Sequence, residues 1–169
     1  MLDTEKIRQL LVALNDELAA MEATGDVVLV GGAVMCLVFN ARVATKDVDA
    51  IFEPTAAIRK AADKVAADFD VPADWLNDAA KGFLYSDPPR QTVLDLPNLR
   101  VCAPTAEYML AMKCVSARFD SLDRDDVAFL IRHLNLQTPE QVFEIIGEYY
   151  PQRAVPPKSR FLVEEILGG

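Results

Sequence analysis

Apolar positions in the first third of the chain follow two patterns, a helical spacing and a continuous run. After Asp3-Thr4, which can cap a helix, they recur at helical spacing and predict an amphipathic helix whose apolar face covers a sheet. Gly25-Asp26 ends this segment, and the continuous run Val27–Val30 predicts a buried strand. A short apolar helix is expected over 33–40, and a second strand over 47–52. The stripe of the first helix consists of Ile7, Leu10, Leu11, Leu14, Leu18 and Met21.

The middle of the chain is less regular. Pro54-Thr55 opens a helical segment in which the Thr55 hydroxyl can cap free N–H groups. The stretch from 71 to 90 is rich in Asp and Pro and is the best candidate for a substrate-facing loop. Two short strands are expected over 93–96 and 99–102. The expected anchors of the irregular stretch are Trp75, Phe83 and Tyr85.

Helical patterns dominate the remainder. Pro104-Thr105 opens a strongly apolar helix, and another is expected to end near Leu134. Thr138-Pro139-Glu140 is a good helix start, and a final helix is expected over 161–167. The length of 169 residues suits one domain with a real core, with or without a small appendage.

Composition narrows the class of protein. Hydrophobic residues make up 51% and charged residues 25%, so the chain is expected to fold rather than remain disordered. Seventeen basic against 26 acidic residues give a net charge of −9, which opposes nonspecific binding to a polyanion. An RNA partner would require one local basic patch. Residues that could supply it are Lys46, Arg59, Lys60, Lys81, Arg90, Arg100, Lys113 and Arg118.

Cysteine and histidine usage indicates a reduced compartment and limits the metal chemistry. Cys36, Cys102 and Cys114 are odd in number, far apart and set in apolar segments, as expected of reduced core cysteines in a cytoplasmic protein. His133 is the only histidine and is expected at a helix end, so a multi-histidine site is excluded. The longest apolar run, Val27–Phe39, contains glycines and is shorter than the ~20 residues that span a bilayer, so no membrane partner is expected.

Two aspartates on the second predicted strand are the main candidates for chemistry. Side chains alternate along a strand, so Asp47 and Asp49 are expected on one side and Val48 and Ala50 in the core. Such a pair is stabilised by a hard divalent cation with oxygen ligands, and Mg²⁺, or Mn²⁺, carrying a nucleotide's phosphates fits. The alternative is two solvated acids at a strand end.

A glycine pair precedes these acids by about 15 residues. Gly31 and Gly32 directly follow the buried strand, where the absence of Cβ atoms lets backbone N–H groups approach a phosphate, with a helix N-terminus behind them. The alternative is a tight strand-to-helix turn.

The order of these features resembles the nucleotidyltransferase superfamily related to DNA polymerase β. That family has a hydrophobic strand, Gly-Gly or Gly-Ser, a helix, and Asp-x-Asp in the next strand, and Gly31-Gly32 and Thr45-Lys46-Asp47-Val48-Asp49 match it. The resemblance implies an α+β fold with an α/β-type core. A small mixed sheet flanked by helices would occupy 1–103, and a helical part, 104–169, would pack on the same domain.

A lysine in an apolar helix extends the resemblance. A buried ammonium at Lys113 needs an anionic partner or a ligand such as a triphosphate, and the alternative is a side chain that reaches water from a core helix. Lys113, Arg118, Asp123 and Asp126 match the lysine, arginine and Asp-x-x-Asp of the AbiEii and MenT type of nucleotidyltransferase, a branch that includes toxins of toxin–antitoxin pairs. For the two acids alone, the alternative is favourable negative charge in the first turn of a helix.

One family feature lacks a clear counterpart. Many members of the superfamily carry a third carboxylate on a later strand, and Asp95 is the nearest candidate. The neighbouring Pro97 suggests a strand end, where aspartate is ordinary. Without Asp95, metal binding would rest on Asp47 and Asp49.

The resemblance implies transfer of a nucleoside monophosphate from a nucleoside triphosphate to an acceptor hydroxyl. Asp47 and Asp49 would hold the metal, and Lys113 and Asp126 would complete the catalytic set. The implied acceptor is RNA, such as a tRNA 3′ end, with a protein or small molecule as alternatives, and a cognate antitoxin is a possible partner. A noncatalytic nucleotide-binding or interaction module is the rival hypothesis. The expected nucleotide-binding residues are Gly31, Gly32, Lys46 and Arg118.

Overall fold

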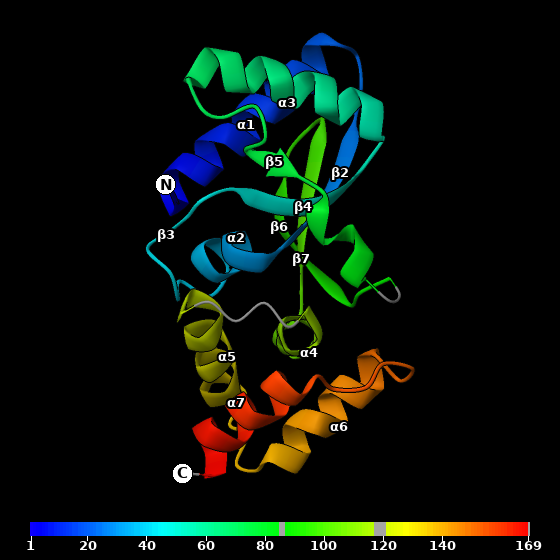
Figure 1. The fold of residues 1–169 in the computed structure, drawn as a ribbon. Helices are drawn as coiled ribbons and strands as arrows, with labels where there is room; N and C mark the ends of the chain where they lie inside the picture. Colours follow the sequence, from blue (N-terminus) through cyan, green and yellow to red (C-terminus); the bar gives the residue numbers. More distant parts are fainter. Residues whose placement is uncertain (85–86, 117–120, 169) are drawn as a thin grey trace. The chain divides into compact units, whose positions relative to one another are not determined.

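A five-stranded mixed sheet has the order β5-β4-β2-β7-β6 (Figure 1). The central strand β2 (Gly25–Val30) pairs antiparallel with β4 (Val48–Glu53) and parallel with β7 (Leu99–Pro104). The edge strand β5 (Leu76–Asn77) runs parallel to β4, and the other edge strand, β6 (Arg90–Asp95), runs antiparallel to β7. The prediction of an α+β fold with a mixed sheet is confirmed.

The structure is a computed structural model that describes residues 1–84, 87–116 and 121–168. Tyr85, a predicted anchor, and Arg118, a predicted site residue, lie outside these ranges. The side chain of Phe83 likewise lies outside the description.

The chain divides into two compact units. The first unit comprises Met1–Gly82 and Arg90–Pro104, and the second unit comprises Phe83–Pro89 and Thr105–Gly169. The division after Pro104 falls next to the predicted one, but the segment Phe83–Pro89 groups with the C-terminal helices instead of with the sheet. Sequence distance does not reveal such a grouping, because it arises from contacts made after the chain folds back.

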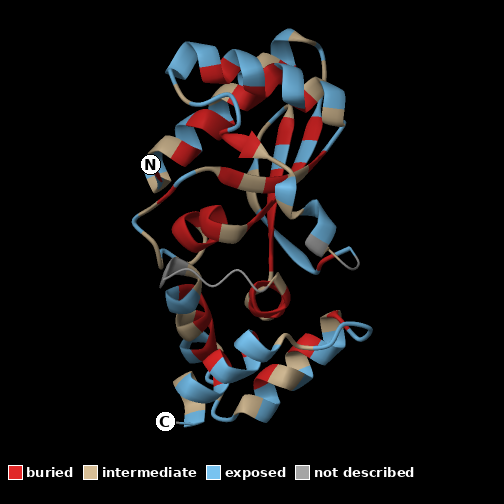
Figure 2. Cartoon of the chain, in the orientation of Figure 1, coloured by how far each residue is buried: buried red, intermediate tan, exposed pale blue. Residues whose placement is uncertain are grey.

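In the first unit, α1 (Thr4–Ala20) and α3 (Thr55–Phe69) lie side by side against the sheet (Figure 1). A Cβ on Gly25 would contact side chains of both helices, so the residues of β2 that alternate with it, Val27 and Leu29, face them too. Figure 2 shows the buried inner side of each helix. The predicted stripe of the first helix forms this core from Ile7 to Leu18, whereas Met21 is the partly exposed C-cap residue. Each fully buried leucine contributes about 1.5–3 kcal/mol.

The caps of these two helices differ from each other. Asp3 caps α1, since its carboxylate accepts a hydrogen bond from the Lys6 N–H at 2.8 Å, as predicted. The prediction for Thr55 is wrong. Pro54 occupies the N-cap position, and the Thr55 hydroxyl donates to the Phe52 carbonyl at 3.4 Å, because Thr55 already belongs to the helix.

Short elements fill the segments that the sequence pattern left irregular. β1 (Leu2–Asp3) and β3 (Ala44–Thr45) form a separate two-stranded sheet, and η1 (Ala79–Phe83) is a 3₁₀-helix. Trp75 is a buried anchor, as predicted, and its indole N–H donates to the Ala62 carbonyl at 3.0 Å. The anchor thus fastens the chain to α3 directly before β5.

The helices α2 (Gly31–Leu37), in the first unit, and α4 (Ala106–Ser116), in the second, are the most deeply buried (Figure 2). α4 packs against α5 (Ser121–His133) and α6 (Pro139–Tyr149). A capping box on Thr138 starts α6 as predicted, and α7 (Pro157–Gly168) ends the chain. Among the described helices, none combines the length and the apolar character needed to cross a membrane.

The three cysteines, Cys36, Cys102 and Cys114, are buried, reduced thiols, as predicted. Burial raises the pKa of Cys114 to about 12, against 9.0 for an ordinary thiol. The nearby Lys113 ammonium opposes this rise, but the effect of burial is larger. The Cys114 thiol is therefore a packing group, and it lacks the lowered pKa of a nucleophile.

We expect burial of Cys114 to make the protein less stable at alkaline pH. The thiol ionises near pH 9 in the unfolded chain and near pH 12 in the folded chain, so its contribution is complete below pH 9 and is lost as the pH rises toward 12. The free energy of unfolding, measured by urea denaturation, should fall in this interval more steeply for the wild type than for Cys114→Ala, by about 1 kcal/mol per pH unit. A constant difference between the two proteins would contradict this assignment.

Candidate functional site

The candidate site of the first unit lies where β2 ends. Val30, the last residue of β2, pairs in register with Asp49 of β4, which in turn pairs with Asn77 of β5. Residues paired in register share a face of the sheet, and this face is opposite to α1 and α3, because Ala50 and Leu29 point toward those helices. Asp49 and Asn77 therefore lie side by side on the sheet face away from the helices. Sequence reasoning did not identify Asn77.

The two predicted acids flank Val48, the first residue of β4. Val48 and Ala50 are buried, whereas Asp47 and Asp49 are partly exposed, as the predicted alternation requires. β4 begins at Val48, so Asp47 lies one residue before the strand, and the preceding Lys46 is exposed.

The carboxylates of Asp47 and Asp49 are the type of ligand that suits a magnesium ion bound together with a nucleotide. Among the described residues, no cluster of three or more His, Cys, Asp or Glu side chains is present. Mg²⁺ is commonly held by one or two carboxylates together with substrate phosphates and waters, rather than by a cage of protein ligands. Asp47 and Asp49 match this pattern.

Gly31 brings the backbone of the turn against Asp49. Its φ of +64° is left-handed, a conformation that side chains other than glycine disfavour. A Cβ on this residue would also lie 2.9 Å from Asp49 Oδ2. Glycine at this position thus permits both the turn and the close approach of the carboxylate.

Gly32 is required for a different contact. A Cβ there would lie 2.5 Å from Thr45 Oγ1 and 2.7 Å from Arg42 Nη1. The side chains of Arg42 and Thr45 therefore pack directly on this residue. The glycine pair is explained by three side chains that approach the turn, and α2 behind it is only seven residues long.

Arg42 is a site residue that sequence reasoning missed. The single sequence signal was its position between the glycine pair and the aspartates, and it did not figure among the predicted basic residues. Its backbone is held to α2, because Ala41 N donates to the Met35 carbonyl at 2.7 Å. On the other side, Thr45 pairs with Leu2 in the two-stranded sheet.

Asp95 does not accompany the other acids. The register pairs Asp26 of β2 with Arg100 of β7, and Arg100 with Asp95 of β6. Asp95 therefore lies at the same level across the sheet as Asp26, whereas Asp49 lies at the level of Val30. Asp26 and Val30 are four residues, or about 13 Å, apart along β2. Asp95 is exposed, and its Oδ1 lies 3.9 Å from Nε of Arg100. The suggestion of a third carboxylate at Asp95 is corrected accordingly.

The neighbouring strands offer no substitute for that carboxylate. β7, all of whose residues are described, has Arg100 as its one charged residue. The start of β6, which lies at the Asp49 end of the sheet, carries Arg90 opposite Pro104. Among the residues proposed for a basic patch, Arg59 forms a salt bridge with Asp78, in which Nη2 and Oδ2 are 2.9 Å apart.

In the second unit, Lys113 is held by two carboxylates. Its Nζ lies 2.8 Å from Asp126 Oδ2 and 3.0 Å from Asp123 Oδ1, which joins α4 to the start of α5. Lys113 is 8% exposed and Asp126 2%, so the alternative of a lysine that reaches open water is wrong. The expected anionic partner is present, and the ion pair with Asp126 fixes the orientation of the Lys113 ammonium. A role of Lys113 toward a triphosphate stays a prediction.

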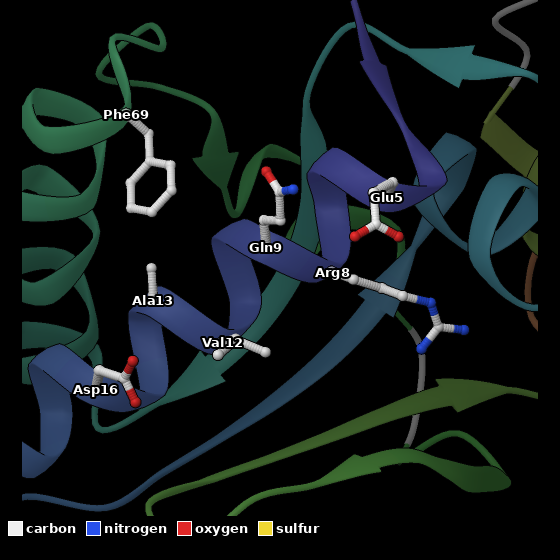
Figure 3. A pocket seen from close by; sticks show the side chains of 7 residues that line it. All are labelled: Glu5, Arg8, Gln9, Val12, Ala13, Asp16 and Phe69. Atoms are coloured by element: carbon white, nitrogen blue, oxygen red, sulfur yellow. The ribbon is translucent and has the colours of Figure 1, made fainter.

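A groove on the outer side of α1 is distinct from the site. Figure 3 shows that Phe69, from the end of α3, faces the α1 side chains that form its floor. The cavity measures about 300 Å³ and includes neither Asp47 nor Asp49. The groove is lined by Glu5, Arg8, Gln9, Val12, Ala13, Asp16 and Phe69.

His133 lies at the end of α5, as predicted. It is exposed and stacks on Phe129.

Comparisons of the chain with family models, with curated proteins and with solved structures give no match. The family resemblance therefore remains a prediction that rests on the motif residues.

Replacement of Gly32 by alanine should destabilise the fold by about 1–3 kcal/mol, because the new methyl group overlaps Thr45, which is 5% exposed and has little room to move. The matched control is Gly147→Ala. Gly147 lies in α6 with nothing near its Cβ position, so alanine there should stabilise by up to about 1 kcal/mol. Urea denaturation measures both effects. Equal stability of Gly32→Ala and the wild type would disprove the close packing.

Replacement of Lys113 by alanine should cost about 3–5 kcal/mol of stability, because Asp126 would remain buried without its cation. Lys64→Ala is the matched control, since Lys64 forms a single exposed ion pair with Asp68 and its loss should change stability little. Thermal and urea denaturation of the three proteins test this. A Lys113→Ala protein as stable as Lys64→Ala would refute a structural role of the ion cluster.

Proposed function

We propose that this chain is a metal-dependent nucleotidyltransferase that moves a nucleoside monophosphate from a nucleoside triphosphate to an acceptor hydroxyl. The observation that carries the proposal is the position of Asp49 against the Gly31–Gly32 turn at the end of β2. The resemblance of the motif supports the same reaction, since it links a glycine pair to an Asp-x-Asp sequence.

In the proposed reaction, the acceptor oxygen forms a bond to the α-phosphorus of the nucleotide. The bond between that phosphorus and the bridging oxygen breaks, and pyrophosphate leaves with the electron pair. When bound, Mg²⁺ would neutralise charge on the phosphates and polarise the phosphorus–oxygen bonds. Asp47 and Asp49 are the residues that would hold it. The hydroxyl proton passes to a carboxylate or to water.

Two further residues contribute positive charge in this proposal. Lys46 is exposed next to Asp47 and can attract a polyphosphate. For Lys113, which Asp123 and Asp126 hold within the second unit, the resemblance implies a role in neutralising charge that develops on phosphate groups. A lysine held by carboxylates loses less side-chain freedom when it acts on an anion, which favours a fixed geometry.

The proposed acceptor is RNA, with a tRNA 3′ end as the first example to test. The net charge of −9 limits nonspecific attraction to RNA, so recognition would depend on a local group of basic residues. A cognate antitoxin is a proposed partner, since the resemblance includes toxins of toxin–antitoxin pairs.

A second candidate function is a nucleotide-binding module without turnover. The observation that favours it is the position of Asp95, which leaves the described end of the sheet with two carboxylates instead of three. Two ligands suffice to bind a metal–nucleotide complex, but a third would help to fix the reacting oxygen.

The experiment that decides is pyrophosphate release from each nucleoside triphosphate with magnesium and total tRNA. We expect one or more nucleotides to support release, and Asp49→Asn to lower the rate at least about 100-fold. Asp26→Asn, an exposed acid at the other end of β2, makes the same change of charge and should leave the rate unaltered.

The outcomes separate the candidates. Release that stops when tRNA is left out would identify RNA as the acceptor. Nucleotide binding without release in the wild type would favour the binding module. Equal loss of activity in the Asp49 and Asp26 variants would argue against a specific role of the β2 end.

A further inference from the structure

Arg42 brings a cation to the end of the sheet that carries the acidic pair. Its Nη1 lies 2.7 Å from the Cβ position of Gly32, while Asp49 Oδ2 lies 2.9 Å from the Cβ position of Gly31. Consecutive Cα atoms are about 3.8 Å apart, so the guanidinium and the carboxylate approach adjacent positions of one turn. An acidic and a basic group thus flank the same stretch of backbone.

A triphosphate at this place needs cations from the protein as well as a metal. Asp47 and Asp49 repel phosphate oxygens, and a metal between them neutralises only part of the charge. The planar guanidinium donates several parallel N–H bonds to phosphate oxygens, a geometry that a lysine ammonium lacks.

The backbone around Arg42 is fixed before any ligand arrives. Ala41 N and Arg42 N donate to the carbonyl of Met35 in α2, at 2.7 and 3.4 Å. The carbonyl of Cys36, also in α2, accepts a hydrogen bond from the Thr4 hydroxyl of α1 at 3.2 Å. Arg42 as a residue is partly exposed, so part of its surface is accessible to a ligand. Such preorganisation lowers the entropic cost of binding.

We propose that Arg42 binds the phosphate groups of the nucleoside triphosphate, and that this side chain, rather than the backbone of the glycine pair, is the main anion-binding group of the first unit. The inference rests on the proposed function. The glycines then serve to let Arg42, Thr45 and Asp49 approach the turn. Base recognition would lie elsewhere, so the loss of Arg42 should affect all nucleotides similarly.

Calorimetric titration of the full chain with inorganic triphosphate and magnesium tests the proposal. Inorganic triphosphate probes the phosphate site alone, because it carries no base or sugar. We expect Arg42→Ala to weaken its binding about 10- to 100-fold, and Arg42→Lys, which keeps the charge, to weaken it less. Arg100→Ala removes the same charge at the other end of the sheet and should leave affinity nearly unchanged.

The outcomes are distinguishable from those of the activity assay. Equal affinity of Arg42→Ala, Arg100→Ala and the wild type would overturn the role of Arg42 while leaving nucleotide transfer intact if pyrophosphate is still released. Weakened binding in Arg42→Ala, together with no release in the wild type, would support the phosphate site and refute catalysis. A wild type that binds neither inorganic triphosphate nor any nucleoside triphosphate would overturn both proposals. Thermal denaturation establishes that each variant is folded, and Arg42→Lys carries the test if Arg42→Ala is not.

Discussion

The antiparallel register between β2 and β4 is the constraint on which the candidate site depends. It places Val30 opposite Asp49, so the turn that follows Val30 starts beside that carboxylate. A shift by one residue would exchange the two faces of β4 and direct Asp49 toward the helices. The buried residues Val48 and Ala50 prevent this shift, because it would expose them and bury the acid.

The glycine pair converts this register into a crowded turn. Gly31 accepts the left-handed backbone that redirects the chain into α2, and the missing Cβ atoms leave space for Asp49 on one residue and Arg42 and Thr45 on the next. The chemistry at this end of the sheet therefore arises from side chains that reach the backbone of the turn. Three segments far apart along the sequence contribute: the glycine pair, Arg42 to Asp49, and Asn77.

The ion cluster of the second unit combines stability with a candidate function. One ammonium and two carboxylates are taken out of water together, and each would be costly alone. The arrangement fixes α4 to the start of α5, which a packed apolar contact would also achieve. The burial of a charged lysine at this position motivates a chemical role for it, and denaturation and activity measurements on the same variants separate the two roles.

The local elements were largely determined by the sequence. The stripe from Ile7 to Leu18 predicts α1, the run Val27–Val30 predicts most of β2, and Thr138 predicts the capping box of α6, because each depends on spacing within one segment. The partly exposed side of β4 followed from alternation alone. The partner of Lys113 was expected in kind, since a buried ammonium requires an anion.

Tertiary structure decided which distant residues meet. Asp95 was the nearest candidate in the sequence for a third carboxylate, but strand pairing places it beside Arg100. The position of a residue in a sheet depends on its register with other strands, which the local pattern does not specify. Sequence reasoning identified neither Arg42 nor Asn77. Position between the glycine pair and the aspartates was the one sequence signal for Arg42, and the two residues reach the site through a turn and an edge strand. The sequence alone therefore determined the elements and the types of charged group, and the folded chain alone determined their neighbours, because local periodicity encodes burial whereas proximity depends on pairing across the sheet.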